Sequence, residues 1–184
     1  MNKTRRRSII LISGAVLAAA GGVALQRSLS DHGEEALVVA NLWTLPLQDF
    51  EGNAQPLTRW KGKILVVNFW ATWCEPCRAE IPGLVRIQEK LATKNVQIVG
   101  ISIDSVAKVK EFAKEFRVQY PLLMGSLDAI EITRKLGNKV GGLPYTVVLD
   151  RNGVIKARHL GGITEADLES AIVPLLNDVS SAHG

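Results

Sequence analysis

The chain has 184 residues, which is enough for one domain with a substantial buried core and an N-terminal appendage. With 47% hydrophobic and 22% charged residues, its composition argues against a disordered chain and against a membrane protein with many spans. The net charge of +4 comes from Lys3, Arg5, Arg6 and Arg7, because residues 8–184 hold equal numbers of acidic and basic side chains. The basic balance is therefore no sign of nucleic-acid binding.

Residues 9–25 form a run of 17 residues without a charge, directly after the basic cluster. A basic start followed by an apolar stretch is typical of a segment that directs export. As a helix it would span roughly 25 Å, slightly less than the hydrocarbon core of a membrane. We expect residues 1–25 to be a signal-anchor that places the rest of the chain in the periplasm. A cleaved signal peptide is the alternative, since Ala18, Ala19 and Ala20 suit a signal peptidase.

Residues 26–36 are polar and predict a linker, so the folded domain is expected to occupy residues 37–184. Its first element should be a short hairpin, because the turn-forming sequence DFEGN at residues 49–53 separates two short stretches that resemble strands. The stretches are residues 42–47 and residues 55–57.

The middle of the chain alternates between strand and helix patterns. The nearly unbroken apolar run ILVVNF at residues 64–69 predicts a central strand that is buried on both faces of a sheet. Helical spacing follows over residues 74–91, with a kink expected at Pro82. A second apolar strand is predicted at residues 96–103, and a helix at residues 106–116 that Asp104 or Ser105 can cap.

The last third of the chain continues with a short extended piece, a short helix, a hairpin and a terminal helix. The predicted ranges are 121–123 for the extended piece, 127–136 for the helix, 146–149 and 154–158 for the hairpin strands, and 164–176 for the last helix, with Thr164 as its cap. Together these patterns indicate an α/β fold in which helices flank a central mixed sheet.

The only two cysteines are Cys74 and Cys77, in the run WCEPC between the central strand and a helix. A disulfide over so short a loop stabilises a fold little, so the spacing favours a reactive pair. Unpaired N–H groups and the helix dipole stabilise a thiolate at a helix start. Cys74 should therefore attack a substrate disulfide, and Cys77, one turn later and more buried, should resolve the mixed disulfide.

Two other cysteine chemistries fit less well. Zinc binding would need further ligands, but the chain has no third cysteine, and its histidines, His32, His159 and His183, are scattered. We therefore expect neither a metal nor another cofactor. A peroxidase on a related fold would want Thr or Ser three residues before its cysteine, where this chain has Ala71.

Two motifs resemble the membrane-anchored thioredoxin-like proteins of the TlpA/ResA type. The first is VNFWATWCEPCRAEIP at residues 67–82, and the second is GLPYTVVLD at residues 142–150. The resemblance covers residues 40–176 and implies a thioredoxin-like fold with an N-terminal β-hairpin and an inserted helix. It also implies a cis peptide bond before Pro144, and substrate contacts made by Trp73, Leu143 and Pro144.

The resemblance also implies an acid-base group. Where cytosolic thioredoxin has a buried aspartate, this chain has Asn68, which takes up no proton. Glu80, one helical turn after Cys77, is the candidate replacement, as in ResA-type relatives. The alternative is that Glu80 is a solvated side chain on the helix surface. Glu75, between the cysteines, would oppose the effect of the helix dipole on the thiolate.

The expected function is that of a thiol-disulfide oxidoreductase that reduces disulfides in exported proteins, such as apocytochrome c during cytochrome c maturation. A reductase in an oxidising compartment needs electrons from a membrane donor. Two alternatives stay open: a non-catalytic binding or chaperone module on the same fold, and a net oxidase or isomerase.

Overall fold

The computed structural model describes residues 33–177 of the chain. Five strands form one sheet in the order β3-β2-β1-β4-β5. Strands β1, β2 and β3 run parallel, whereas β4 is antiparallel to β1 and β5 is antiparallel to β4. The strands are β1 (Ile64–Trp70), β2 (Val96–Ser102), β3 (Leu122–Met124), β4 (Tyr145–Leu149) and β5 (Ile155–Leu160). The expected α/β class with a central mixed sheet is confirmed.

Strand β1 lies at the centre of the sheet, and all seven of its residues are buried. Its side chains alternate between two apolar layers, because successive residues of a strand point to opposite faces. Val66 and Trp70 belong to the layer that includes the buried side of the cysteine-bearing helix, and Val67 and Phe69 belong to the other layer. The continuous apolar run thus reflects burial on both faces, as the sequence predicts.

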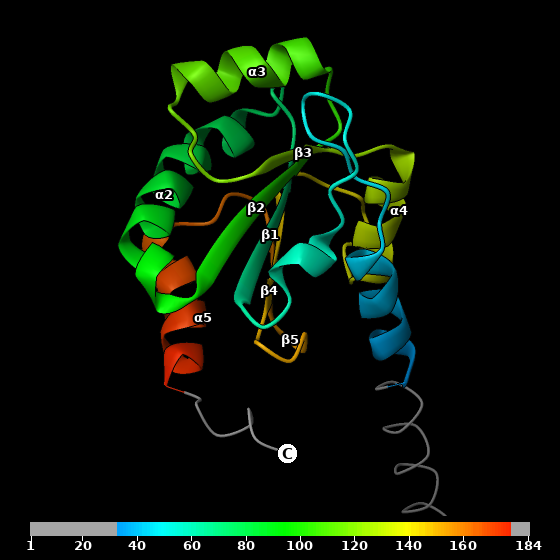
Figure 1. Cartoon of the computed structure of the whole chain (residues 1–184), viewed down its shortest axis with the longest axis vertical. Coiled ribbons are helices and arrows are strands. Elements are labelled where there is room, and N and C mark those ends of the chain that lie inside the picture. Colours follow the sequence, from blue (N-terminus) through cyan, green and yellow to red (C-terminus); the bar gives the residue numbers. More distant parts are fainter. Residues whose placement is uncertain (1–32, 178–184) are drawn as a thin grey trace, which may run out of the picture. The chain divides into compact units, whose positions relative to one another are not determined.

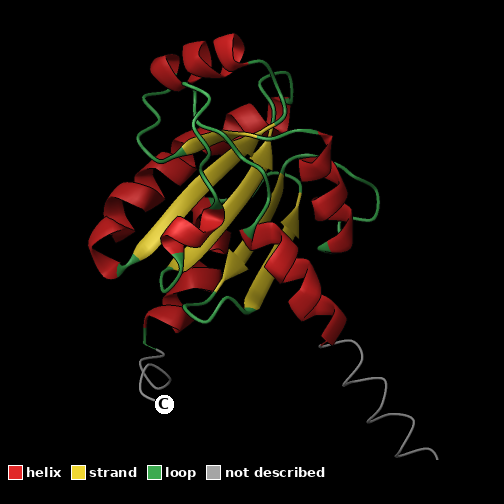
Figure 2. Ribbon diagram, turned by 45° about the vertical axis from the view of Figure 1, so that its right-hand side comes forward, coloured by secondary structure: helices red, strands yellow, loops and turns green. Residues whose placement is uncertain are grey.

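Helices cover both faces of the sheet (Figures 1 and 2). Helices α2 and α5 lie on one face and pack against each other, and α3 contributes Val109 and Phe112 to the same core layer. Helix α4 covers the opposite face through Ala129 and Ile132. Their bounds are α2 (Glu75–Leu91), α3 (Val106–Glu115), α4 (Leu127–Lys135) and α5 (Glu165–Leu176), and two 3-10 turns are η1 (Leu57–Trp60) and η2 (Ala92–Lys94).

The prediction of an N-terminal β-hairpin at residues 42–57 is wrong, since no pair of strands forms there. Residues 33–43 are helical instead, because Val39, Leu42 and Trp43 recur at helical spacing and are buried together. The end of the stretch expected to be a linker, residues 33–36, is therefore helical as well. Of the hairpin only one antiparallel bridge remains, between Gln48 and Ala54.

The turn and the neighbouring sheet account for this difference. The Asp49 carboxylate accepts hydrogen bonds from the N–H groups of Glu51 and Asn53, at 3.0 and 2.9 Å, which closes a tight Asx-type turn. Gln48 exchanges backbone hydrogen bonds with Met124 of β3, so the segment extends the sheet edge instead of forming two strands of its own.

Among residues 33–177, no helix is both long and apolar enough to cross a membrane. The apolar segment predicted at residues 9–25 lies outside the described residues, so its role as anchor or signal peptide stays a prediction.

Candidate active site at the end of the central strand

The two cysteines lie where the chain leaves β1 and enters α2. Cys74 is the N-cap residue of α2 and has extended backbone geometry, and Cys77 lies in the first turn of the helix. They form a disulfide, with 5.2 Å between their Cα atoms. Cys74 keeps 6% of its surface exposed, while Cys77 is fully buried. In the reduced protein, a reagent or substrate from solvent would therefore meet Cys74 first.

Helix α2 favours an anion at Cys74. The first N–H groups of the helix have no partner within the helix, and the positive end of its dipole points toward the N-cap. Pro76 adopts helical geometry in this first turn without the loss of a hydrogen bond, because it needs no N–H there. Exposed Glu75 places a negative charge in the same turn and opposes the dipole.

Glu80 is buried and is not a solvated surface residue, with 6% of its surface exposed. One carboxylate oxygen, Oε1, accepts a hydrogen bond from Asn68 Nδ2 at 2.7 Å, and the other, Oε2, accepts one from the Ile163 N–H at 2.8 Å. Burial raises the pKa of Glu80 to about 7, although both hydrogen bonds favour the charged form and lower it. The side chain can therefore gain or lose a proton near neutral pH.

Asn68 and Thr146 support this carboxylate from the sheet. The two residues lie directly opposite each other on β1 and β4, and both are buried. Asn68 Nδ2 also donates to Thr146 Oγ1 at 3.0 Å, which orients the amide toward Glu80. The sequence marked Asn68 as a polar residue in an apolar strand, but it gave no signal for Thr146.

A groove of about 370 Å³ reaches Glu80 from the surface. Pro76, Ala79 and Gly83 of α2 line one side, and the segment that leads into α5 lines the other. The groove connects a buried carboxylate to solvent, so a proton taken up by Glu80 has a route out. Sequence patterns did not reveal this groove, because residues 80 and 163 meet only in the folded chain.

The loop before β4 lies at the same end of β1. The Leu143–Pro144 peptide bond is cis, which is the geometry that the resemblance implies. Tyr145 pairs with Phe69 in the sheet, so the cis-proline loop lies next to the segment that carries the cysteines. Trp73 is 66% exposed beside Cys74, and Leu143 is half-buried. Substrate contacts by Trp73, Leu143 and Pro144 stay predictions.

The structure also reveals a contact that the sequence did not predict. The sequence indicates that either Asp104 or Ser105 can cap α3, but Ser105 occupies the N-cap position without a side-chain cap hydrogen bond. Instead, the Asp104 carboxylate accepts a hydrogen bond from the hydroxyl of Thr72, two residues before Cys74. This hydrogen bond links the segment after β2 to the cysteine-bearing loop. The two segments lie close together because β1 and β2 are adjacent and parallel.

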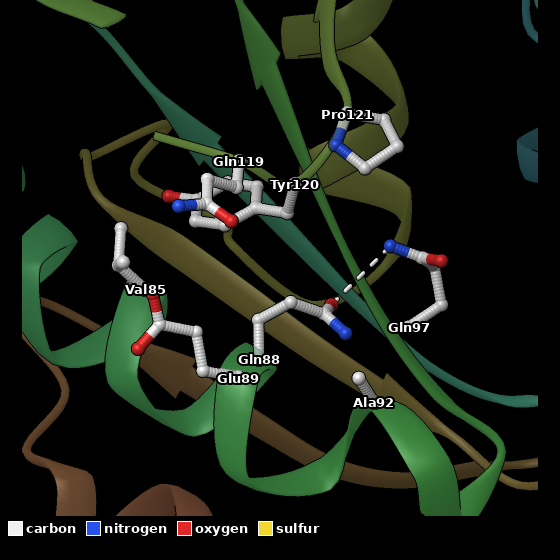
Figure 3. A pocket seen from close by; sticks show the side chains of 8 residues that line it. All are labelled: Val85, Gln88, Glu89, Ala92, Gln97, Gln119, Tyr120 and Pro121. Atoms are coloured by element: carbon white, nitrogen blue, oxygen red, sulfur yellow. Dashed lines mark hydrogen bonds between the residues drawn. The ribbon is translucent and has the colours of Figure 1, made fainter. Parts of the chain in front are cut away.

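A second pocket, of about 280 Å³, lies away from the cysteines, between the C-terminal half of α2 and the segment before β3 (Figure 3). Three of its eight lining residues are glutamines, and Gln97 donates to Gln88 across it at 3.2 Å. Burial, and then the charge of Glu80, raise the pKa of Tyr120, another lining residue, so its phenol stays neutral.

Within residues 33–177, no three His, Cys, Asp or Glu side chains gather closely enough to hold a metal ion.

Comparisons with known proteins agree with this geometry. The model of the AhpC/TSA family matches residues 38–158. The thiol-disulfide oxidoreductase ResA of Geobacillus thermodenitrificans is 29% identical over 173 residues, which cover 92% of this chain and 95% of that protein. A thiol:disulfide interchange protein of the thioredoxin family from Chlorobium tepidum superposes with a TM-score of 0.64, at 29% identity, and covers 72% of this chain and 95% of its own.

A third relative is described as a secreted thiol-disulfide isomerase, from Corynebacterium glutamicum. Its structure superposes with a TM-score of 0.63 at 25% identity, and the match covers 72% of this chain and 83% of that protein.

Proposed function

Because the chain belongs to the AhpC/TSA family of thioredoxin-like proteins and is a thiol-disulfide oxidoreductase, we propose that it works as a net reductase of disulfides in exported proteins. Apocytochrome c before haem attachment is the substrate class that we propose first. The buried Glu80, one helical turn after Cys77 and with a pKa of about 7, carries the exchange chemistry of this proposal, and the reduction potential decides the net direction of electron flow.

The first step is attack of the Cys74 thiolate on a substrate disulfide. A bond forms between Cys74 and one substrate sulfur, and the other substrate sulfur leaves as a thiolate. The helix start stabilises the attacking anion, and exposed Trp73 would contact the substrate at this point. An extended substrate segment would bind along Leu143 and Pro144 by β-strand addition.

The second step needs a base near Cys77, because this thiol is fully buried. The Glu80 carboxylate accepts the proton of Cys77, whose thiolate then attacks Cys74 and forms the Cys74–Cys77 disulfide. The substrate leaves with both of its sulfurs reduced, so two electrons have passed from the cysteine pair to the substrate. Glu80 then returns its proton to solvent through the groove that it lines.

Turnover requires that the Cys74–Cys77 disulfide be reduced again. We propose that a membrane electron donor supplies the two electrons, and that residues 9–25 hold the chain in the bacterial inner membrane with the domain in the periplasm. The basic cluster before the apolar segment and the secreted relative support this location. If the segment is cleaved, the same domain would be a soluble periplasmic protein.

The reduction potential tests the direction of electron flow. Equilibration with glutathione should give a potential near the value of about −270 mV that is typical of thioredoxin, whereas a net oxidase would lie near about −120 mV. A potential in the oxidase range would contradict the reductase proposal and favour the alternative.

Insulin reduction with dithiothreitol tests for turnover. The Cys74→Ser, Cys77→Ser double variant is the control, and a binding module without turnover would show no more activity than this control.

A kinetic comparison tests the role of Glu80. Glu80→Gln should slow disulfide exchange and remove the rise in rate around neutral pH, because the amide accepts no proton from Cys77. Exposed Glu89 on the same helix provides the matched control as Glu89→Gln. Equal rates and equal pH profiles for the Glu80→Gln variant and the original protein would assign the proton transfer to solvent.

A further inference from the structure

The loop of residues 71–73 carries Cys74 from β1 to α2 and has few anchors of its own. Trp73 projects into solvent with 66% of its surface exposed, and Ala71 offers only a methyl group to the core. Thr72, between them, is half-buried, and its hydroxyl donates a hydrogen bond to Asp104 Oδ2. This is the side-chain hydrogen bond that ties the loop to the neighbouring strand segment.

Asp104 is a firmly held acceptor. Its side chain is 8% exposed, its Oδ1 accepts from the Ser105 N–H at 2.7 Å, and Lys108 Nζ lies 3.6 Å from the same oxygen. Burial raises the pKa of Asp104, but the hydrogen bonds from Thr72 and Ser105 and the charge of Lys108 outweigh it, so the pKa lies below the usual range. Asp104 is therefore a charged acceptor at neutral pH, and such hydrogen bonds are the stronger kind.

A second contact holds Thr72 through its backbone carbonyl. The carbonyl oxygen of Thr72 lies 3.5 Å from Arg78 Nη1. The Arg78 guanidinium in turn lies over the ring of Phe112 on α3, 5.1 Å from its centroid. Thr72 is thus held through its hydroxyl by the segment after β2, and through its carbonyl by a side chain that packs on α3.

We propose that the Thr72–Asp104 hydrogen bond holds the cysteine-bearing loop in place and thereby lowers the reduction potential of the pair. In the oxidised protein, the bond to buried Cys77 fixes Cys74 covalently. Two electrons and two protons convert the disulfide to two thiols, and this covalent constraint disappears. Because the covalent bond already holds the loop in the oxidised form, the hydrogen bond forms there at a smaller entropic cost, so it contributes more to the stability of the oxidised form than to that of the reduced form.

Thr72 and Asp104 are positioning residues in this account, since they act through the loop and not on the reacting sulfurs. A contact that stabilises the oxidised form selectively lowers the reduction potential, because the potential measures the free-energy difference between the two forms. A purely structural contact would stabilise both forms equally and would leave the potential unchanged. The inference rests on the redox pair alone and holds for either net direction of electron flow.

The test uses the full-length protein in detergent with Thr72→Val, which removes the hydroxyl and keeps the β-branched shape. The equilibrium constant for oxidation by glutathione disulfide should fall about tenfold, which corresponds to a potential about 30 mV less negative. Thr72→Ser, which keeps the hydroxyl, should stay within about twofold of the original protein. Denaturant unfolding should show a larger loss of stability for Thr72→Val in the oxidised form than in the reduced form.

Two controls make the result decisive. Ser126→Ala removes a comparable hydroxyl–carboxylate hydrogen bond, to Asp128 at the start of α4, on the other face of the sheet, and should leave the potential unchanged. In an Asp104→Ala background, Thr72→Val should change the equilibrium constant less than about twofold, since the acceptor is absent. An unchanged potential in Thr72→Val, or equal loss of stability in both redox forms, would overturn the inference. The reductase proposal is tested by a separate measurement, the reduction potential of the original protein.

Discussion

The buried carboxylate of Glu80 makes the stability of the fold depend on pH. Burial raises the pKa of Glu80 from 4.5 to about 7. Below about pH 4.5, the group is protonated in both the folded and the unfolded chain, so it contributes no pH dependence. As the pH rises toward 7, the unfolded chain releases a proton that the folded chain retains, and the free energy of unfolding falls. Above about pH 7 the decrease is complete.

The size of this decrease follows from the two pKa values. A difference between about 7 and 4.5 corresponds to about 3 kcal/mol of unfolding free energy. Glu80→Gln removes this titration. Two donors, Asn68 Nδ2 and the Ile163 N–H, face the carboxylate oxygens of Glu80. The glutamine amide has one oxygen and satisfies only one of them, so the substitution costs about 1 kcal/mol of unfolding free energy at every pH. We therefore expect Glu80→Gln to be less stable than the original protein at low pH, and more stable above about pH 7 by about 2 kcal/mol.

Urea unfolding of the oxidised protein at several values between about pH 4 and pH 9 measures this crossover. The oxidised form excludes any contribution from cysteine titration, because disulfide sulfurs do not titrate. Glu89→Gln, on the exposed side of the same helix, should keep the pH dependence of the original protein. Parallel curves for Glu80→Gln and the original protein, without a crossover, would refute the pKa and its assignment to burial.

Three further predictions address the cysteines, the support of Glu80 and the packing of the sheet. Brief iodoacetamide treatment of the reduced protein should label Cys74 before Cys77, and Cys77→Ala should trap mixed disulfides on non-reducing gels; preferential labelling of Cys77 would reverse the roles. Asn68→Leu removes a hydrogen bond that lowers the pKa of Glu80, so the pH profile of exchange should move to higher pH; a shift to lower pH would contradict this. Gly100→Ala would place a Cβ atom 2.6 Å from the side chain of Leu122, and thermal unfolding should show a loss of about 1–3 kcal/mol; an unchanged melting temperature would show that this side chain moves aside without cost.

The sequence predicted those parts of the fold and site that depend on local patterns. The apolar run of β1, the helix after Cys74 and the turn at residues 150–153 each have a pattern that fixes one structure, and all three form as expected. The prediction of strands in the N-terminal segment was wrong. Val39, Leu42 and Trp43 fit one face of a helix, which a search for short strands overlooks. In this case tertiary packing decided between two local patterns.

From local residue patterns alone, the site was predictable only where its residues are neighbours along the chain, whereas the cis bond before Pro144 followed from the family resemblance. The cysteine pair and Glu80 share one helix, so their spacing alone places them together. The partners Thr146 and Asp104 come from other strands or their ends, and their pairing depends on sheet order and register, which no local pattern specifies. The pKa of Glu80 likewise depends on burial against the segment before α5, which forms only in the complete fold.

The opposed pair Asn68 and Thr146 also bears on how the sheet assembles. Strand register is ambiguous in a sheet whose central strands are almost wholly apolar, because one valine or leucine packs nearly as well as the next. A slip of β4 by one residue would turn Thr146 to the other face and leave the buried Asn68 amide without this acceptor, at a cost of about 1–3 kcal/mol. Asn68 and Thr146, which support Glu80, would then also favour the correct register of the strands. A misaligned sheet would lack a properly supported Glu80, so chemical competence and correct assembly are coupled in this protein.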